Sequence, residues 1–172
     1  MGNLHAYQGV KEIEISLLKI DENTFTFKLS QYDSSEPIVI DPDLTTLESG
    51  TYLGGSNGDG ITDIITSGDS VFVVGYTQSA DFPVTPHAYD TSFNSGGYDV
   101  FVASFDKDLS TLYAATFLGG SDSDRGNAIA KTSDGGFVVA GQTFSSDFPI
   151  VYGYQSSRRG SADAFVPKVP SI

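Results

Sequence analysis

The sequence has 172 residues, of which 39% are hydrophobic and 12% aromatic, enough for the core of one or two domains. Acidic residues outnumber basic ones by 22 to 9, and the formal net charge of −13 disfavours nucleic-acid phosphates and anionic membrane surfaces as partners. Cysteine is absent, which excludes disulfides, Cys-ligated zinc and a thiol nucleophile. No apolar run is long enough for membrane insertion, and residues 1–10 hold no signal peptide, so we expect any export signal upstream.

Residues 1–45 are predicted to form a β-hairpin lead-in, the end of an upstream domain. Apolar and polar residues alternate over residues 10–18 and again over 24–29, and Asp21, Glu22 and Asn23 supply a turn between the two runs. The alternation predicts one dry face, formed by Ile13, Ile15, Leu17, Phe25, Phe27 and Leu29.

Residues 46–110 and 111–172 are two copies of one repeat. Four blocks recur in the same order: YLGGS at 52–56 and FLGGS at 117–121, FVVGYT at 72–77 and VVAGQT at 138–143, DFP at 81–83 and 147–149, and DVFV at 99–102 and DAFV at 163–166. Such self-similarity is typical of repeat architectures, in which each copy is one supersecondary unit.

Each repeat contains four short strand-like runs bounded by Gly, Asp and Ser. In the second copy we expect strands at 112–118, 127–131, 136–143 and 162–169, and in the first copy the leading strand at 51–53. Val- and Phe-rich runs at 71–76 and 137–142 are predicted to be the central strands. Helical periodicity is absent, so the fold class is all-β, with about two β-propeller-type, four-stranded antiparallel blades in an incomplete ring.

The turns of such a meander alternate between the two ends of a blade. The long connection at 78–98 and the Gly-Gly-Ser loops therefore share one end, and the tight turns at 106–110 and 132–135 share the other. Loops held by a rigid scaffold tend to carry function, so the first end is the expected functional face.

Several blocks resemble the SBBP β-propeller repeat of bacterial exported proteins, namely YLGGS at 52–56, GYT at 75–77, DFPVTP at 81–86, AY at 88–89 and DVFVA at 99–103. The second copy departs from the pattern at 152–154 and at Pro167. The proline disfavours a central position for the last strand of this copy. Tyr32-Asp33 and PIVIDP at 37–42 are similar to the end of an uncharacterised domain that often precedes these repeats. The resemblance implies export or surface display and no catalytic mechanism.

Asn57, Asp59 and Asp63 on a Gly-rich loop are the candidate calcium ligands, because alternating Asn and Asp supply the oxygen donors that calcium needs. The alternative is that these side chains cap turns by accepting hydrogen bonds from nearby backbone N–H groups. No other cofactor is expected.

Phe82, Tyr89, Phe148 and Tyr154 place aromatic rings in the long loops and are the candidate ligand-binding residues, as a sugar-stacking platform in each repeat. The alternative is that Phe82 and Phe148 anchor their loops by burial. Residues 54–58 match the G-x-S-x-G nucleophile pattern, but no strand-turn-helix context follows and the second copy breaks the match at Ser123.

The sequence therefore predicts a non-catalytic, extracellular or cell-surface repeat module for binding or scaffolding, with a carbohydrate or protein ligand. The alternative is part of a glycan-active propeller enzyme whose catalytic groups lie outside these residues. Asp81 and Asp99 recur as Asp147 and Asp163, which favours structural over catalytic roles for them. We expect these repeats to pack against further blades, or the chain to self-associate through exposed strand edges at 51–53 and 162–169.

Overall fold

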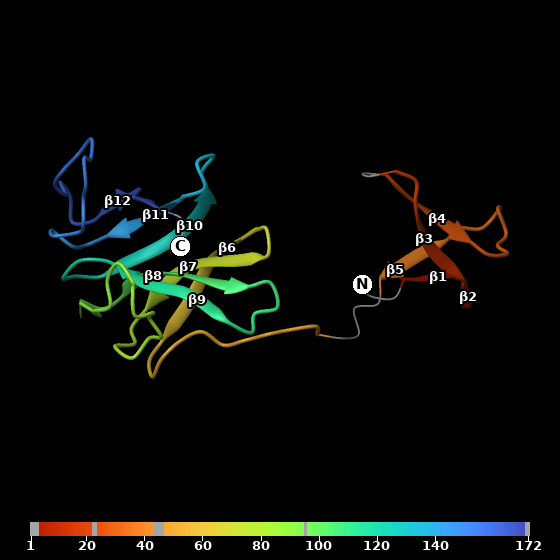
Figure 1. Cartoon of the computed structure of the whole chain (residues 1–172), viewed down its shortest axis with the longest axis horizontal. Helices are drawn as coiled ribbons and strands as arrows, with labels where there is room; N and C mark the ends of the chain where they lie inside the picture. Colours follow the sequence, from red (N-terminus) through yellow and green to blue (C-terminus); the bar gives the residue numbers. More distant parts are fainter. Residues whose placement is uncertain (1–3, 22–23, 43–46, 95, 171–172) are drawn as a thin grey trace. The chain divides into compact units, whose positions relative to one another are not determined.

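A computed structural model describes residues 4–21, 24–42, 47–94 and 96–170, and every regular element within these ranges is a β-strand. The all-β fold class is thus confirmed for the described part of the chain. Within that part, no helix has the length and apolar character needed to cross a membrane. The chain divides into two compact units, residues 1–48 and 49–172 (Figure 1).

The first unit contains two small antiparallel sheets. Its strands are β1 (Leu4–Gln8), β2 (Lys11–Ile13), β3 (Ile15–Lys19), β4 (Phe25–Leu29) and β5 (Val39–Pro42). One sheet has the order β2-β1-β5, and the other pairs β3 with β4. Gly9, with a φ of 58°, makes the turn between β1 and β2, a conformation that glycine adopts without steric cost.

The predicted hairpin corresponds to β3–β4, where Ile15 lies opposite Leu29 and Leu17 opposite Phe27. Two details differ from the prediction. The run over residues 10–18 is interrupted, because β2 ends at Ile13 and pairs with β1 in a separate sheet. The apolar face is also not dry, since Leu17, Phe25 and Phe27 are 42–52% exposed.

The second unit contains two antiparallel sheets, and residues 112–118, assigned from the sequence to the second copy, pair in the first sheet. The first sheet is β6 (Asp59–Ser67), β7 (Ser70–Thr77), β8 (Asp99–Asp106) and β9 (Leu112–Leu118), paired in that order. The second is β10 (Asp124–Lys131), β11 (Phe137–Thr143), β12 (Asp163–Phe165) and β13 (Lys168–Val169), with the order β10-β11-β12 and β13 also on β11. The prediction that β7 and β11 are central strands is confirmed.

The two sheets also share an irregularity. A β-bulge falls between Ile61 and Asp63 in β6 and between Gly126 and Ala128 in β10. These positions correspond in the repeat, so the bulge belongs to the repeat unit and re-aims the side chains that follow it.

The last predicted strand and the first one require correction. Residues 162–169 are divided into β12 and β13, because Pro167 has no N–H to give to the ladder; its carbonyl still accepts from Val139 N at 3.1 Å. Residues 51–53 form no strand, since no described strand runs beside them to supply a ladder. Leu53 packs against the first sheet instead, and Tyr52 is fully exposed.

The core of the second unit lies between its two sheets, which pack against each other (Figure 1). Phe72 of β7 meets Phe137 of β11 with ring centroids 4.3 Å apart. Along β8, Val100 and Val102 belong to this core, whereas Phe101 and Ala103 belong to a second cluster on the other face of the first sheet. The alternation follows from the two-residue period of a strand and makes the first sheet apolar on both faces.

Candidate functional site

The loop before β6 is held in place by two carboxylates. Asp59 Oδ2 accepts hydrogen bonds from Gly55 N at 2.8 Å and from Ser79 Oγ at 3.0 Å, and Asp59 Oδ1 accepts one from Thr77 Oγ1. Asp81 Oδ1 accepts from Ser56 N at 2.9 Å and from Ser56 Oγ at 2.8 Å. We call this arrangement the loop clamp, because it joins the Gly-Gly-Ser loop to the start of the long loop after β7.

The second repeat contains the same loop clamp with nearly the same distances. Asp124 Oδ2 accepts from Gly120 N at 2.7 Å and Ser145 Oγ at 2.8 Å. Asp147 Oδ1 accepts from Ser121 N at 2.8 Å and Ser121 Oγ at 3.0 Å. The recurrence explains why the blocks that contain these residues repeat: two carboxylates, two serine hydroxyls and a backbone without a side chain in the way are needed each time.

Each loop clamp requires a glycine at one position, Gly55 in the first repeat and Gly120 in the second, because a side chain there would collide with its neighbours. A Cβ atom on Gly55 would stand 2.4 Å from Asp81 Oδ1 and 2.6 Å from Ser79 Cβ. A Cβ atom on Gly120 would stand 2.5 Å from Asp147 Oδ1 and 2.6 Å from Ser145 Cβ. Both distances are too short for real atoms, so the carboxylates approach the backbone only where no side chain intervenes.

These hydrogen bonds lower the pKa values of Asp81 and Asp147. In each case the cause is the backbone and side-chain donors of the facing serine, Ser56 or Ser121, which stabilise the charged carboxylate. The hydroxyl of Ser56, the residue at the centre of the G-x-S-x-G pattern, donates to Asp81 Oδ1 as part of the loop clamp.

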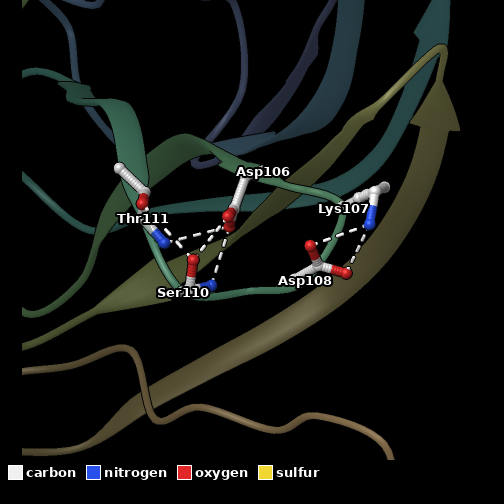
Figure 2. A network of polar contacts seen from close by, with 5 residues as sticks. All are labelled: Asp106, Lys107, Asp108, Ser110 and Thr111. Atoms are coloured by element: carbon white, nitrogen blue, oxygen red, sulfur yellow. Dashed lines mark hydrogen bonds and ion pairs between the residues drawn. The ribbon is translucent and has the colours of Figure 1, made fainter.

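The opposite end of the first sheet has a compact turn (Figure 2). Asp106 Oδ1 accepts from Ser110 N at 2.7 Å and Thr111 N at 2.9 Å, and Lys107 pairs with Asp108 at 2.7 Å. Leu109 has a φ of 56°, which the surrounding hydrogen bonds enforce. The polar groups of this turn bond one another or the backbone of the turn itself, and the connection is short, so the loop-clamp end with its long loops is the better candidate for a binding face.

The predicted calcium ligands have other partners in the structure. Asp59 is saturated by the loop clamp, and Asp63 accepts from Ile64 N and Ile129 N, both at 2.9 Å. Asn57 Nδ2 donates to Gln78 O at 3.3 Å. Among the described residues there is no group of three or more His, Cys, Asp or Glu side chains that could hold a metal. Calcium at these three residues stays a prediction.

The four predicted ligand-binding aromatics separate into two pairs. Phe82 and Phe148 are buried, and their rings stack on Phe101 and Phe165 with centroids 4.5 Å and 4.4 Å apart. These two rings anchor their loops in the core and have no face open to a sugar. Tyr89 is 70% exposed and Tyr154 fully exposed, so both remain available to a ligand.

The sequence did not indicate a depression that lies beside the second long loop. It has a volume of about 430 Å³ and is lined by residues of that loop and of β12, among them Ile150, Gln155, Ser157, Arg158, Asp163 and Phe165. Gln155 Nε2 donates to Asp163 Oδ2 at 3.0 Å, and Arg159 N donates to the same atom at 2.9 Å. The lining thus combines polar groups with the apolar side chains of Ile150 and Phe165, and a few placed polar groups in a partly apolar hollow are usual in small-ligand sites.

Asp99 and Asp124 form a second feature that the sequence did not indicate. Both carboxylates are fully buried, and Asp99 Oδ1 and Asp124 Oδ1 have no hydrogen-bond partner. Burial raises the pKa of Asp99 to about 6, the Asn94 N–H opposes this shift, and the nearby charges of Asp124 and Asp90 add to it. Among the residues that the structure describes, neither carboxylate takes part in an ion pair.

Comparison of the chain with known protein families, curated proteins and solved structures found no match. The resemblance to the SBBP repeat therefore stays a prediction.

Proposed function

We propose that the chain is a non-catalytic binding and scaffolding module, built from propeller-type repeats, whose ligand binds at the loop-clamp end. The observation that carries this proposal is the recurrence of the loop clamp in both repeats. In each repeat it fixes the root of a long loop on a rigid sheet, which is how repeat scaffolds present binding loops.

The propeller arrangement is supported by the packing of the second unit. The first three strands follow the same order in both sheets, and β10 lies against the first sheet through Thr62 Oγ1, which donates to Gly126 O at 2.8 Å. A Cβ atom on Gly126 would stand 2.6 Å from Val74, so β10 approaches β7 of the first sheet closely. A propeller arrangement requires such close packing of successive four-stranded sheets.

A neutral glycan is the ligand class that we favour. The depression beside the second long loop combines amide, hydroxyl and guanidinium groups with apolar surface, and the exposed ring of Tyr154 lies in the same loop. Sugars are bound by hydrogen bonds at their edges and by aromatic rings at their faces. The net charge of −13 disfavours anionic polysaccharides.

A glycan array probed with the labelled chain tests this proposal, followed by calorimetry on the best ligand. Arg158→Ala and Tyr154→Ala should each weaken binding about tenfold or more, because each removes a direct contact. Tyr113→Ala is the matched control, since this tyrosine is also exposed but lies in β9 near the opposite turn. Absence of glycan binding, or binding that all three variants retain, would contradict the proposal.

We further infer that the module acts outside the cell, which the resemblance to exported repeats supports. Fractionation of cells that produce the natural protein should recover it from the medium or the outer surface. Recovery in the cytosol alone would contradict this inference.

A further inference from the structure

The junction between the two repeats contains two buried acids, Asp99 and Asp124, for which the described residues provide no ion pair. Asp99 begins β8 of the first sheet, and Asp124 begins β10 of the second. Both border the point that a Cβ atom on Gly119 would occupy, which lies 3.4 Å from Asp99 Oδ1 and 2.9 Å from Asp124 Oδ2. We propose that Asp99 and Asp124 hold a calcium ion at this junction.

The unpartnered oxygens are the observation that points to a ligand. Asp99 Oδ2 accepts from Asn94 N at 2.8 Å, and Asp124 Oδ2 accepts from Gly120 N and Ser145 Oγ. The remaining oxygen of each carboxylate is buried and accepts nothing. A buried carboxylate oxygen without a donor is costly, and buried charges are generally paired or coordinate metals.

The other copies of these residues provide an internal comparison. Asp59, the counterpart of Asp124, accepts hydrogen bonds on both oxygens. Asp163, the counterpart of Asp99, accepts from Gly160 N on Oδ1 and from Arg159 N on Oδ2. The second oxygen of Asp59 is satisfied by Thr77 Oγ1, whereas Thr143, the counterpart of Thr77, donates to Ser145 O at 3.5 Å and leaves Asp124 Oδ1 without a donor. The two unsatisfied oxygens therefore belong to the pair of acids that lies where the two repeats meet.

Calcium fits the donors better than other ions do. All the donors are hard oxygens, and cysteine, the soft ligand preferred by several transition metals, is absent from the chain. Two carboxylates supply only part of a calcium shell, and backbone carbonyls and water would supply the rest.

Calorimetric titration of the full chain with calcium chloride at pH 7.5 tests the site. We expect one ion per chain with a dissociation constant of roughly 10⁻⁵ to 10⁻³ M, the range of regulatory and extracellular sites. Asp99→Asn should weaken binding at least tenfold, and Gly119→Ala should do so by placing a methyl group between the carboxylates. Asp163→Asn is the matched control and should bind as the natural chain does.

Terbium luminescence, excited through tyrosine, provides a second readout, because Tyr98 directly precedes Asp99 in the chain. The signal should disappear in Asp99→Asn and be displaced by calcium in the natural chain. Circular dichroism in EDTA checks that each variant is folded. No binding at 5 mM calcium, or binding that Asp99→Asn retains, would overturn the proposal. Binding abolished only by Asp59→Asn would assign the ion to the Gly-rich loop instead. The test is independent of glycan binding.

Discussion

At the scale of single residues, the repeat is defined by its loop clamp. Asp, Ser and Gly recur because each supplies one part: a carboxylate accepts, a hydroxyl bridges, and a residue without Cβ admits the carboxylate to the backbone. Side-chain hydrogen bonds to backbone N–H groups commonly fix a loop whose backbone is not hydrogen-bonded to a neighbouring strand. The role of these residues is structural, and it leaves the rest of each long loop free to vary.

Gly55→Ala should destabilise the second unit. The added methyl group cannot fit beside Asp81 and Ser79, so either the loop clamp opens or the loop shifts, at a cost of about 1–3 kcal/mol. Gly58→Ala, in the same loop, should change stability by less than about 0.5 kcal/mol, because its Cβ would meet only the end of Gln78 at 3.1 Å. Urea unfolding followed by circular dichroism measures both; equal effects would contradict the steric argument.

The loop clamp should also be sensitive to acid. The pKa of Asp81 is lowered in the folded protein, so its contribution to stability is present above the unfolded value of 3.8 and is lost as the pH falls through the lower folded value. Asp81→Asn should therefore destabilise the protein at pH 7, and its difference from the natural chain should shrink towards pH 3. Urea unfolding at several pH values measures this difference, and a difference independent of pH would contradict the prediction.

At the scale of elements, each long loop is anchored by one buried ring. Phe82 and Phe148 occupy equivalent positions and stack on equivalent phenylalanines of β8 and β12. A loop of this length without regular structure would be costly to order, and the buried aromatic surface offsets part of that cost.

Phe82→Ala should lower the free energy of unfolding by about 3–5 kcal/mol, since it removes a buried ring and leaves a cavity beside Phe101. Tyr89→Ala, in the same loop, should cost less than about 0.5 kcal/mol because its ring is exposed. Chemical unfolding of the two variants measures the contrast. A mild effect of Phe82→Ala would show that the loop is held by its polar contacts alone.

At the scale of the whole molecule, residues at equivalent positions of the two sheets differ in how far they are exposed to solvent. Ile129 is 4% exposed, whereas its counterpart Ile64 is 58% exposed; Val102 is 1% exposed, whereas its counterpart Val166 is 72% exposed. The buried members lie at the junction between the sheets, and the exposed members lie where a neighbouring sheet would complete the same contact. Apolar side chains at such positions favour association with a further sheet of the same kind.

We therefore expect the isolated chain to self-associate head to tail, through these faces as well as through the strand edges. Ile64→Asp and Val166→Asp should each block one end and reduce the average mass in sedimentation experiments. A mixture of the two variants should form a dimer that does not extend, since each variant retains one intact end. A natural chain that stays monomeric at high micromolar concentration would contradict this prediction.

Much of the second unit could be predicted from the sequence. The recurrence of four blocks located the repeats, and their Val- and Phe-rich runs located the central strands β7 and β11, because buried strands have local signatures of composition and turn residues. The proline at 167 likewise argued against a central position for the last strand, since the missing N–H is a property of the residue itself, and β12 lies at the end of its sheet. The alternating pattern also located the β3–β4 hairpin.

The tertiary structure decided what depends on neighbours distant in the sequence. Residues 51–53 have the composition of a strand but form none, because a strand exists only beside a partner. The same limit applies to Phe82, whose pattern fitted both a ligand platform and a core anchor until its packing on Phe101 was known. Asp99 and Asp124 are unremarkable in the sequence, and only the packing of two sheets brings them together in the interior without a counter-charge. Burial is a property of the assembled sheets, so the sequence by itself determined the repeat, and the fold determined which of its polar residues are left unsatisfied.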